Sequence, residues 1–182
     1  MPLSPPAARE KQHVRDYRIE GYRREDGLWD IEAHMTDVKT YGFANQHRGR
    51  VEAGEPLHDM WIRMTLDEDL TVHSVEAATD AGPYGLCPEI APNFARLSGL
   101  RLGPGWNRAI KERVGGVEGC THLRELLAAM ATVAYQTMYP VLSRKAAENP
   151  KPGKPALLDS CHAYRSDGPV VRQNWPDHYR GT

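Results

Sequence analysis

The sequence predicts an α+β domain in which helices pack on one face of a mostly antiparallel sheet. Apolar residues alternate with polar ones as far as about residue 80, which is typical of strands. Beyond that point they recur at offsets of three and four, which is typical of helices. Strands that come first and helices that follow favour a sheet covered on one side. The length of 182 residues is enough for one such domain with a buried core.

The first half of the chain predicts two β-hairpins. Residues 16–38 alternate on either side of Asp26-Gly27, a dipeptide typical of a tight hairpin turn. Residues 59–78 alternate again around a short acidic turn. Between the hairpins, residues 40–56 are rich in Gly, Arg and Asn and predict a long connection. Residues 1–14 are rich in proline and charge, so we expect a loose N-terminal arm.

The second half predicts three helices and a tail. Residues 88–98 and 104–113 each begin with proline and end at glycine, the usual order of helix start and stop. Residues 121–147 carry apolar side chains at helical spacing and predict the core helix of a domain that spans residues 15–147. Residues 148–182 begin with linker composition, contain a short predicted strand at 169–171, and are expected to wrap over the domain surface.

The charge and hydropathy patterns bear on the partners and the compartment that we expect for this protein. The net charge is −1, and Lys and Arg are scattered among Asp and Glu, so we expect neither a nucleic-acid nor an anionic-membrane partner. The sequence has no apolar run of about 18 residues and no leader-like start, which predicts a cytoplasmic protein. In that reducing compartment, three cysteines indicate metal ligands, a nucleophile or inert thiols rather than a disulfide.

Four residues are candidate metal ligands: His58, Asp59, Cys87 and Cys120. His58-Asp59 opens a predicted strand, and each cysteine precedes a predicted helix. A helix N-terminus favours the thiolate that a metal binds. Two thiolates, an imidazole and a carboxylate complete a tetrahedron for Zn²⁺, which we expect ahead of iron.

Each candidate also has a purely structural interpretation. Cysteine is among the most buried residue types, so any of the three thiols is equally well explained as part of a core. His58 alone fits a surface or strand-capping histidine, and Asp59 fits an acceptor of backbone N–H bonds. On an ideal helix His122 points away from Cys120, which leaves it outside the first ligand shell. Cys161-His162 in the tail supplies either a further ligand or cap over the site, or no more than a packed tail cysteine.

Residues 55–136 resemble the NifU/IscU-type iron–sulfur scaffold domain. Pro56-Leu57-His58-Asp59-Met60 stands where that family has a Pro-x-Cys-Gly-Asp segment, and Cys87 and Cys120 stand before its helices. The resemblance implies an IscU-like fold over residues 55–147, with an added N-terminal hairpin and a C-terminal tail. Since His58 replaces the first scaffold cysteine, a single zinc ion is favoured over the alternatives, iron or an iron–sulfur cluster.

The chain also resembles a bacterial family of uncharacterised function. Residues 21–29, 56–60 and 119–123 carry this resemblance. It implies a link to the catabolism of aromatic compounds.

Two functional classes follow from the predicted site. In the first, an open metal position activates a small aromatic or acyl substrate for hydrolysis, hydration or a lyase step, with Asp59 or His58 as the catalytic proton carrier. In the second, a closed site stabilises an accessory subunit or a sulfur- or metal-handling partner of another protein. A metal-free thiol enzyme that uses Cys120 and His58 is a third alternative. Self-association into a homo-oligomer stays open.

Overall fold

The computed structural model describes residues 3–149 and 153–181, which form two compact units. The first unit covers the chain up to Leu142, and the second begins at Ser143. The sequence places the corresponding boundary after residue 147, where the predicted core helix ends. Residues 3–12 precede the first strand, are exposed, and form neither helix nor strand.

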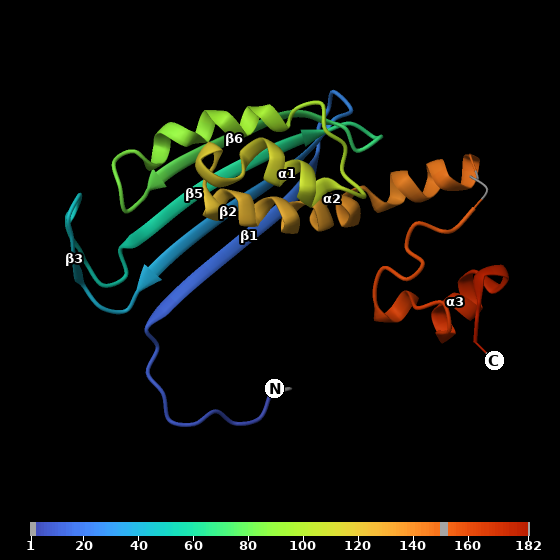
Figure 1. Ribbon diagram of the computed structural model, residues 1–182, viewed down its shortest axis with the longest axis horizontal. Coiled ribbons are helices and arrows are strands. Elements are labelled where there is room, and N and C mark those ends of the chain that lie inside the picture. Colours follow the sequence, from blue (N-terminus) through green and yellow to red (C-terminus); the bar gives the residue numbers. More distant parts are fainter. Residues whose placement is uncertain (1–2, 150–152, 182) are drawn as a thin grey trace. The chain divides into compact units, whose positions relative to one another are not determined.

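A four-stranded antiparallel sheet is the framework of the first unit (Figure 1). Its strands are β1 (His13–Arg23), β2 (Trp29–Lys39), β5 (Pro56–Leu66) and β6 (Val72–Ala81), and their order in the sheet is β1-β2-β5-β6. Both predicted hairpins are confirmed, because β1 pairs with β2 and β5 pairs with β6. Gly27, in the turn of the first hairpin, has a φ of 85°, a conformation that glycine adopts without strain.

The long connection between the hairpins contains a small hairpin of its own. Its strands are β3 (Phe43–Asn45) and β4 (Gly49–Val51). Each is three residues long, too short for an alternating pattern to predict.

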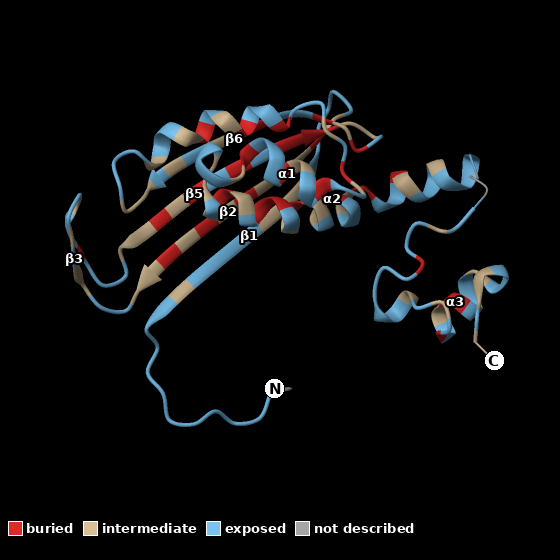
Figure 2. Ribbon diagram, viewed as in Figure 1, coloured by how far each residue is buried: buried red, intermediate tan, exposed pale blue. Residues whose placement is uncertain are grey.

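The helices of the first unit lie on one face of the sheet (Figures 1 and 2), as predicted. They are η1 (Cys87–Leu97), α1 (Trp106–Val114), the short η2 (Gly116–Glu118) and the part of α2 (Thr121–Glu148) that ends at Leu142. η1 is a 3-10 helix, and it contains Pro92, which lacks the N–H that an internal helical position donates.

Alternation along the strands and one stripe of α2 build the core between sheet and helices. Every second residue of β2 from Trp29 to Asp37 is buried, and the side chains between them are only partly buried (Figure 2). The helix approaches β1 closely, because a Cβ atom on Gly21 would lie 2.0 Å from Thr137 Oγ1 of α2. Trp106 Nε1 joins α1 to α2 by donating to the Leu127 carbonyl at 3.2 Å.

The second unit holds η3 (His162–Tyr164), α3 (Pro169–Asn174) and η4 (Pro176–His178). The predicted strand at residues 169–171 is wrong, because these residues form the first turn of α3. Proline at a helix start has no N–H to lose, which favours this outcome over a strand. Part of the linker-like stretch, residues 150–152, lies outside the described residues, and wrapping of the tail over the domain stays a prediction.

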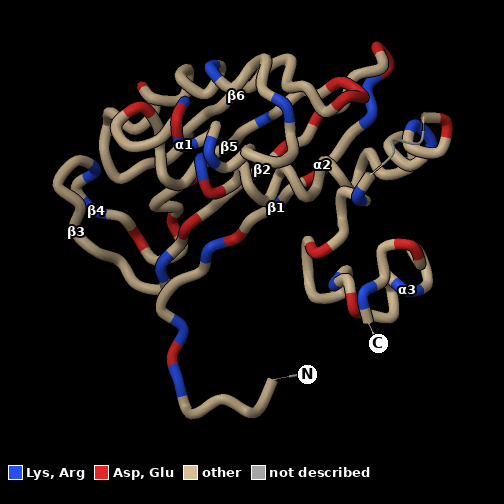
Figure 3. The backbone as a smooth tube through the Cα atoms, turned by 45° about the vertical axis from the view of Figure 1, so that its right-hand side comes forward, with Lys and Arg blue, Asp and Glu red and all other residues tan. Residues whose placement is uncertain are grey.

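Charged residues of both signs are mixed along the chain. Lys and Arg are interspersed with Asp and Glu over the strands and helices (Figure 3). None of the helices in the described ranges combines the length and the apolar character that a membrane span requires.

Candidate functional site

One end of the sheet gathers titratable side chains on the face that the helices cover. Antiparallel pairing brings the starts of β1 and β5 to the same end as the finish of β2. The strand register aligns Arg15, Asp37 and His58 in one row across these three strands. The start of α2 adds His122 to the row, because the His58 and His122 rings lie 3.9 Å apart between centroids.

Asp37 is the centre of this row and is only 2% exposed. It accepts two hydrogen bonds from Arg15, with Nε to Oδ1 and Nη2 to Oδ2 both at 2.7 Å. His13 Nε2 lies 2.8 Å from Oδ1, and His58 Nδ1 lies 2.9 Å from Oδ2. Burial alone would raise the pKa of Asp37, but the hydrogen bonds from Arg15 and His13 lower it to about 2. Asp37 is therefore a carboxylate at neutral pH.

Arg15 also ties the row to the helix layer. Its Nη1 lies 3.0 Å from Glu125 Oε2 on α2, and Tyr17 donates to the same carboxylate oxygen at 2.9 Å. Because one guanidinium binds carboxylates on β2 and on α2, it holds strand and helix in register at this end of the sheet.

The two imidazoles of the row are neutral at pH 7. Burial is the main reason that the pKa of His58 is lowered, the nearby His122 adds to it, and Asp37 opposes it only in part. Burial and then Arg15 lower the pKa of His122. A neutral imidazole has one nitrogen lone pair. Since a carboxylate can only accept, His58 donates from Nδ1 to Asp37, which leaves the lone pair on Nε2.

Three of these groups lie close enough together to contact one metal ion. Within the described ranges, one ligand atom each from Asp37, His58 and His122 lie within 4.8 Å of one another. Asp37 is already bonded by Arg15, His13 and His58. It therefore fits the outer carboxylate that orients a metal-binding histidine better than it fits a direct ligand.

His58 is the one predicted ligand that belongs to this group. Asp59 follows it in sequence, but successive strand residues point to opposite faces. Asp59 Oδ1 lies 2.7 Å from His34 Nε2, and the ring of His34 stacks on the exposed Trp61. His58 and Asp59, the catalytic pair predicted from the sequence, therefore lie on opposite faces of the sheet.

The two predicted cysteine ligands lie at the same end of the sheet as His58, outside the group of three. Cys120 directly precedes α2, and its Sγ lies 3.8 Å from His122 Nδ1. Cys87 begins η1 and packs against Gly82, where a Cβ atom would lie 3.2 Å from Cys87 Sγ. Cys161 is exposed and belongs to the second unit.

The family of this chain follows from comparison with protein-family models. A family described as "Protein of unknown function (DUF2889)" matches residues 13–136. The chain belongs to DUF2889. The matched segment runs from the first residue of β1 into α2 and so contains the whole Arg15, Asp37, His58 and His122 row. No curated protein and no solved structure matches the chain.

The sequence did not point to two members of this row, Asp37 and His122. Asp37 lies on the buried face of β2, on the same side as Trp29, Ile31, Ala33 and Met35. A carboxylate at a position where the alternation expects an apolar residue indicates a buried hydrogen-bond network. His122 was set aside on ideal helix geometry. That geometry does not apply, because Cys120 lies outside the helix, which begins at Thr121.

The DUF2889 match agrees with the expectation of an uncharacterised family. It covers the sheet and the first part of the core helix, and it supplies no reaction.

Proposed function

We propose that this protein binds a metal ion, zinc ahead of iron, through His58 and His122, and that the ion activates a small aromatic or acyl substrate. The observation that supports this proposal is the convergence of two neutral imidazoles with a buried carboxylate behind one of them. Imidazole is a good ligand for zinc. A carboxylate bonded to the other ring nitrogen, as Asp37 is to His58, fixes the tautomer and orientation of that ligand.

Cys120 is the third ligand in this proposal, although it lies outside the group whose ligand atoms are within 4.8 Å of one another, so its side chain would have to turn toward the ion. In a tetrahedral zinc site with Zn–N near 2.1 Å and Zn–S near 2.3 Å, ligand atoms lie about 3.6 Å apart. The distance of 3.8 Å from Cys120 Sγ to His122 Nδ1 is close to that value. A site with two imidazoles and one thiolate keeps one position open for water or a substrate oxygen.

The chemistry of the open position is Lewis-acid activation. Zinc lowers the pKa of a bound water to about 7 or polarises a carbonyl group, which serves hydrolysis, hydration and lyase reactions. In this arrangement Asp37 would keep His58 oriented and would not itself move a proton. Asp59 remains a proposed proton carrier only for a substrate that reaches the other face of the sheet.

The second candidate is an accessory or sulfur- and metal-handling protein with a closed site. The placement of Cys87 at the same end of the sheet as His58 favours this candidate. Four protein ligands would leave no position for a substrate. The NifU/IscU resemblance, with iron or a cluster as cargo, belongs to this second candidate.

Metal analysis tests the shared part of both candidates. Protein purified with zinc present should carry about one equivalent, and chelation should lower its melting temperature. His58→Ala and His122→Ala should each remove the metal. His73→Ala is the matched control, because His73 is an exposed histidine of the same sheet that bonds Asp67 at 3.1 Å. Metal-free protein whose melting temperature is indifferent to chelator would refute the proposal.

The cysteines separate the two candidates. If Cys120→Ser lowers metal content and Cys87→Ser does not, the site has an open position and the catalytic candidate stands. If both variants lower it equally, the site is closed and the accessory candidate stands. A zinc-edge anomalous map of crystals checks the same point by the presence of a water ligand.

A further inference from the structure

The face of the sheet turned away from the helices carries side chains with a common character. Strand alternation places on it the residues between the core positions of β1, β2, β5 and β6. Several are well exposed: the exposed fraction is 43% for Trp61, and for the side chains of Arg63 and Glu76 it is 48% and 77%. We call this surface the outer face.

The outer face is strongly acidic. Its strand residues bear seven carboxylates and two guanidinium groups, a formal charge of −5 against −1 for the whole chain, and Arg24, directly after β1, also pairs with Asp30 at 3.5 Å. The carboxylates are those of Asp16, Glu20, Asp30, Glu32, Asp59, Glu76 and Asp80, and the guanidinium groups are those of Arg18 and Arg63. Such a surface attracts cationic partners and repels phosphate-bearing ones.

An immobilised tryptophan lies at the centre of the outer face. Trp61 stacks on His34 with ring centroids 3.6 Å apart and an angle of 6° between the planes. Its Nε1 donates to Asp80 Oδ2 at 3.1 Å, and His34 is held in turn by Asp59. An exposed indole that is already fixed loses little side-chain entropy on binding, and tryptophan is enriched at the energetic centres of interfaces.

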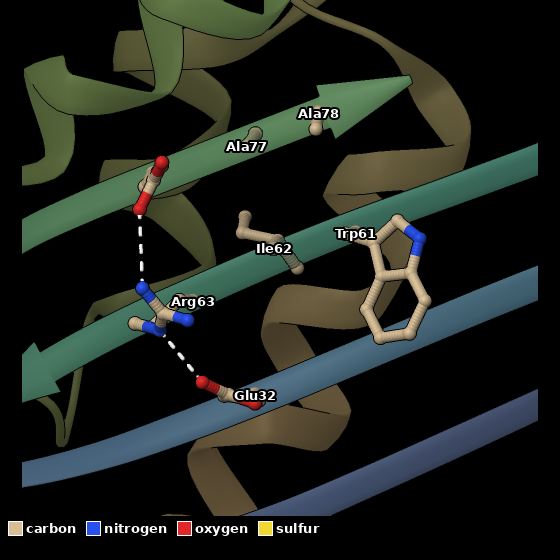
Figure 4. Close-up of a pocket in the computed structure, with 7 residues that line it drawn as sticks. Glu32, Trp61, Ile62, Arg63, Ala77 and Ala78 are labelled. Carbon is tan, nitrogen blue, oxygen red and sulfur yellow. Dashed lines mark hydrogen bonds and ion pairs between the residues drawn. The ribbon is translucent and has the colours of Figure 1, made fainter. Parts of the chain in front are cut away.

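Beside Trp61 the outer face is hollowed (Figure 4). The hollow has a volume of about 220 Å³, and small residues, Ala77 and Ala78, line it on β6. Its opposite wall is Arg63, which bonds Glu32 at 2.6 Å and Glu76 at 3.3 Å. The hollow therefore offers a lysine or arginine side chain an aromatic wall on one side, and two carboxylates, Glu32 and Glu76, for which that side chain would compete with Arg63.

We propose that the outer face is a docking surface for a basic segment of another protein, with one cationic side chain against Trp61 in the hollow over Ala78. Charge complementarity selects this occupant. A second copy would bring an equally acidic face, and nucleic acids and anionic membranes would bring phosphates, so like charges disfavour all three. The proposal does not depend on the metal site, which lies on the other face of the sheet.

Binding of an oligolysine peptide to the full-length protein tests this proposal. In ¹H–¹⁵N spectra, the peptide should shift the resonances of His34, Trp61 and Ala78 and leave those of α2 in place. Added salt should weaken binding, because exposed charges are screened. Oligoglutamate and a DNA duplex are the negative probes, and sedimentation without peptide checks for self-association.

Variants of the outer face complete the test. Trp61→Ala should weaken oligolysine binding at least tenfold, and Glu76→Gln, at a fully surface position, should weaken it about threefold without affecting the fold. Tyr139→Ala removes an aromatic side chain from α2 that is even more exposed than Trp61, 63% against 43%, and should leave binding unchanged. Unchanged binding in both outer-face variants, equal binding of oligoglutamate or DNA, or self-association through Trp61 would each overturn the proposal.

Discussion

Replacing Asp37 by asparagine should destabilise the protein by at least about 2 kcal/mol at pH 7. The amide is almost isosteric, so the change removes the charge while the packing remains. The pKa of Asp37 falls from its ordinary value of 3.8 to about 2 in the folded protein. Each tenfold change in proton affinity is worth about 1.4 kcal/mol, which gives the stated magnitude. The asparagine variant also deprives the partly exposed guanidinium of Arg15 of one of its two carboxylate partners, which adds to the loss.

The destabilisation caused by Asp37→Asn should vanish in acid. Because the folded pKa is the lower one, the stabilisation is complete above the unfolded pKa and is lost as the pH falls through the folded pKa. About half of it should be gone by pH 3 and most of it by pH 2. Wild type and Asp37→Asn should therefore differ at neutral pH and converge between pH 4 and pH 2.

Urea unfolding at a series of pH values measures this difference. Asp16→Asn is the control, because Asp16 is an exposed carboxylate on the neighbouring strand and its loss should cost less than about 0.5 kcal/mol. A constant gap between wild type and Asp37→Asn from pH 7 to pH 2 would refute the charge argument and indicate a packing defect instead.

Three further predictions concern packing and the thiols. Gly21→Ala should destabilise by about 1–3 kcal/mol, because the new Cβ would lie 2.0 Å from Thr137 Oγ1, and Thr137→Ala should recover part of this loss in urea unfolding. In the same assay, Trp106→Phe should lower the free energy of unfolding by about 1 kcal/mol more than Trp29→Phe does. The reason is that Trp106 Nε1 bonds the Leu127 carbonyl, whereas Trp29 Nε1 is buried without a partner within the described ranges. Equal losses would contradict this. Cys161→Ser should keep both metal content and melting temperature, and a fall in metal content would place Cys161 among the ligands.

The local pattern of the chain predicted the fold well because strand and helix periods are local. Each hairpin needed only an alternating run on both sides of a turn, and the core helix needed only its apolar stripe. The failure at residues 169–171 has a physical cause. β-Branched residues after Pro169 resembled a strand, although proline at a helix start decided otherwise. The short helix expected at residues 88–98 is confirmed, as the 3-10 helix η1, which contains Pro92.

The site was harder to predict because it depends on pairing between hairpins. His58 and Asp37 meet only through the register of β2 against β5, and the chain between them is a long connection with a hairpin of its own. No local period fixes that register. Asp59 was chosen for its adjacency to His58, although strand alternation alone separates the two side chains. Of the predicted ligands, Cys120 lies next to His122, and the ring of His122 lies beside that of His58.

The position of β1 at the edge of the sheet has a consequence for solubility. An open edge of 11 residues offers unpaired backbone groups to any other strand, the first step of aggregation. Here the strand bears Arg15, Asp16, Arg18, Glu20 and Arg23, and strand addition from any other chain would have to bury part of this charge. Arg15 is also fixed by Asp37 and Glu125, so the residue that organises the candidate site helps to keep the sheet at four strands.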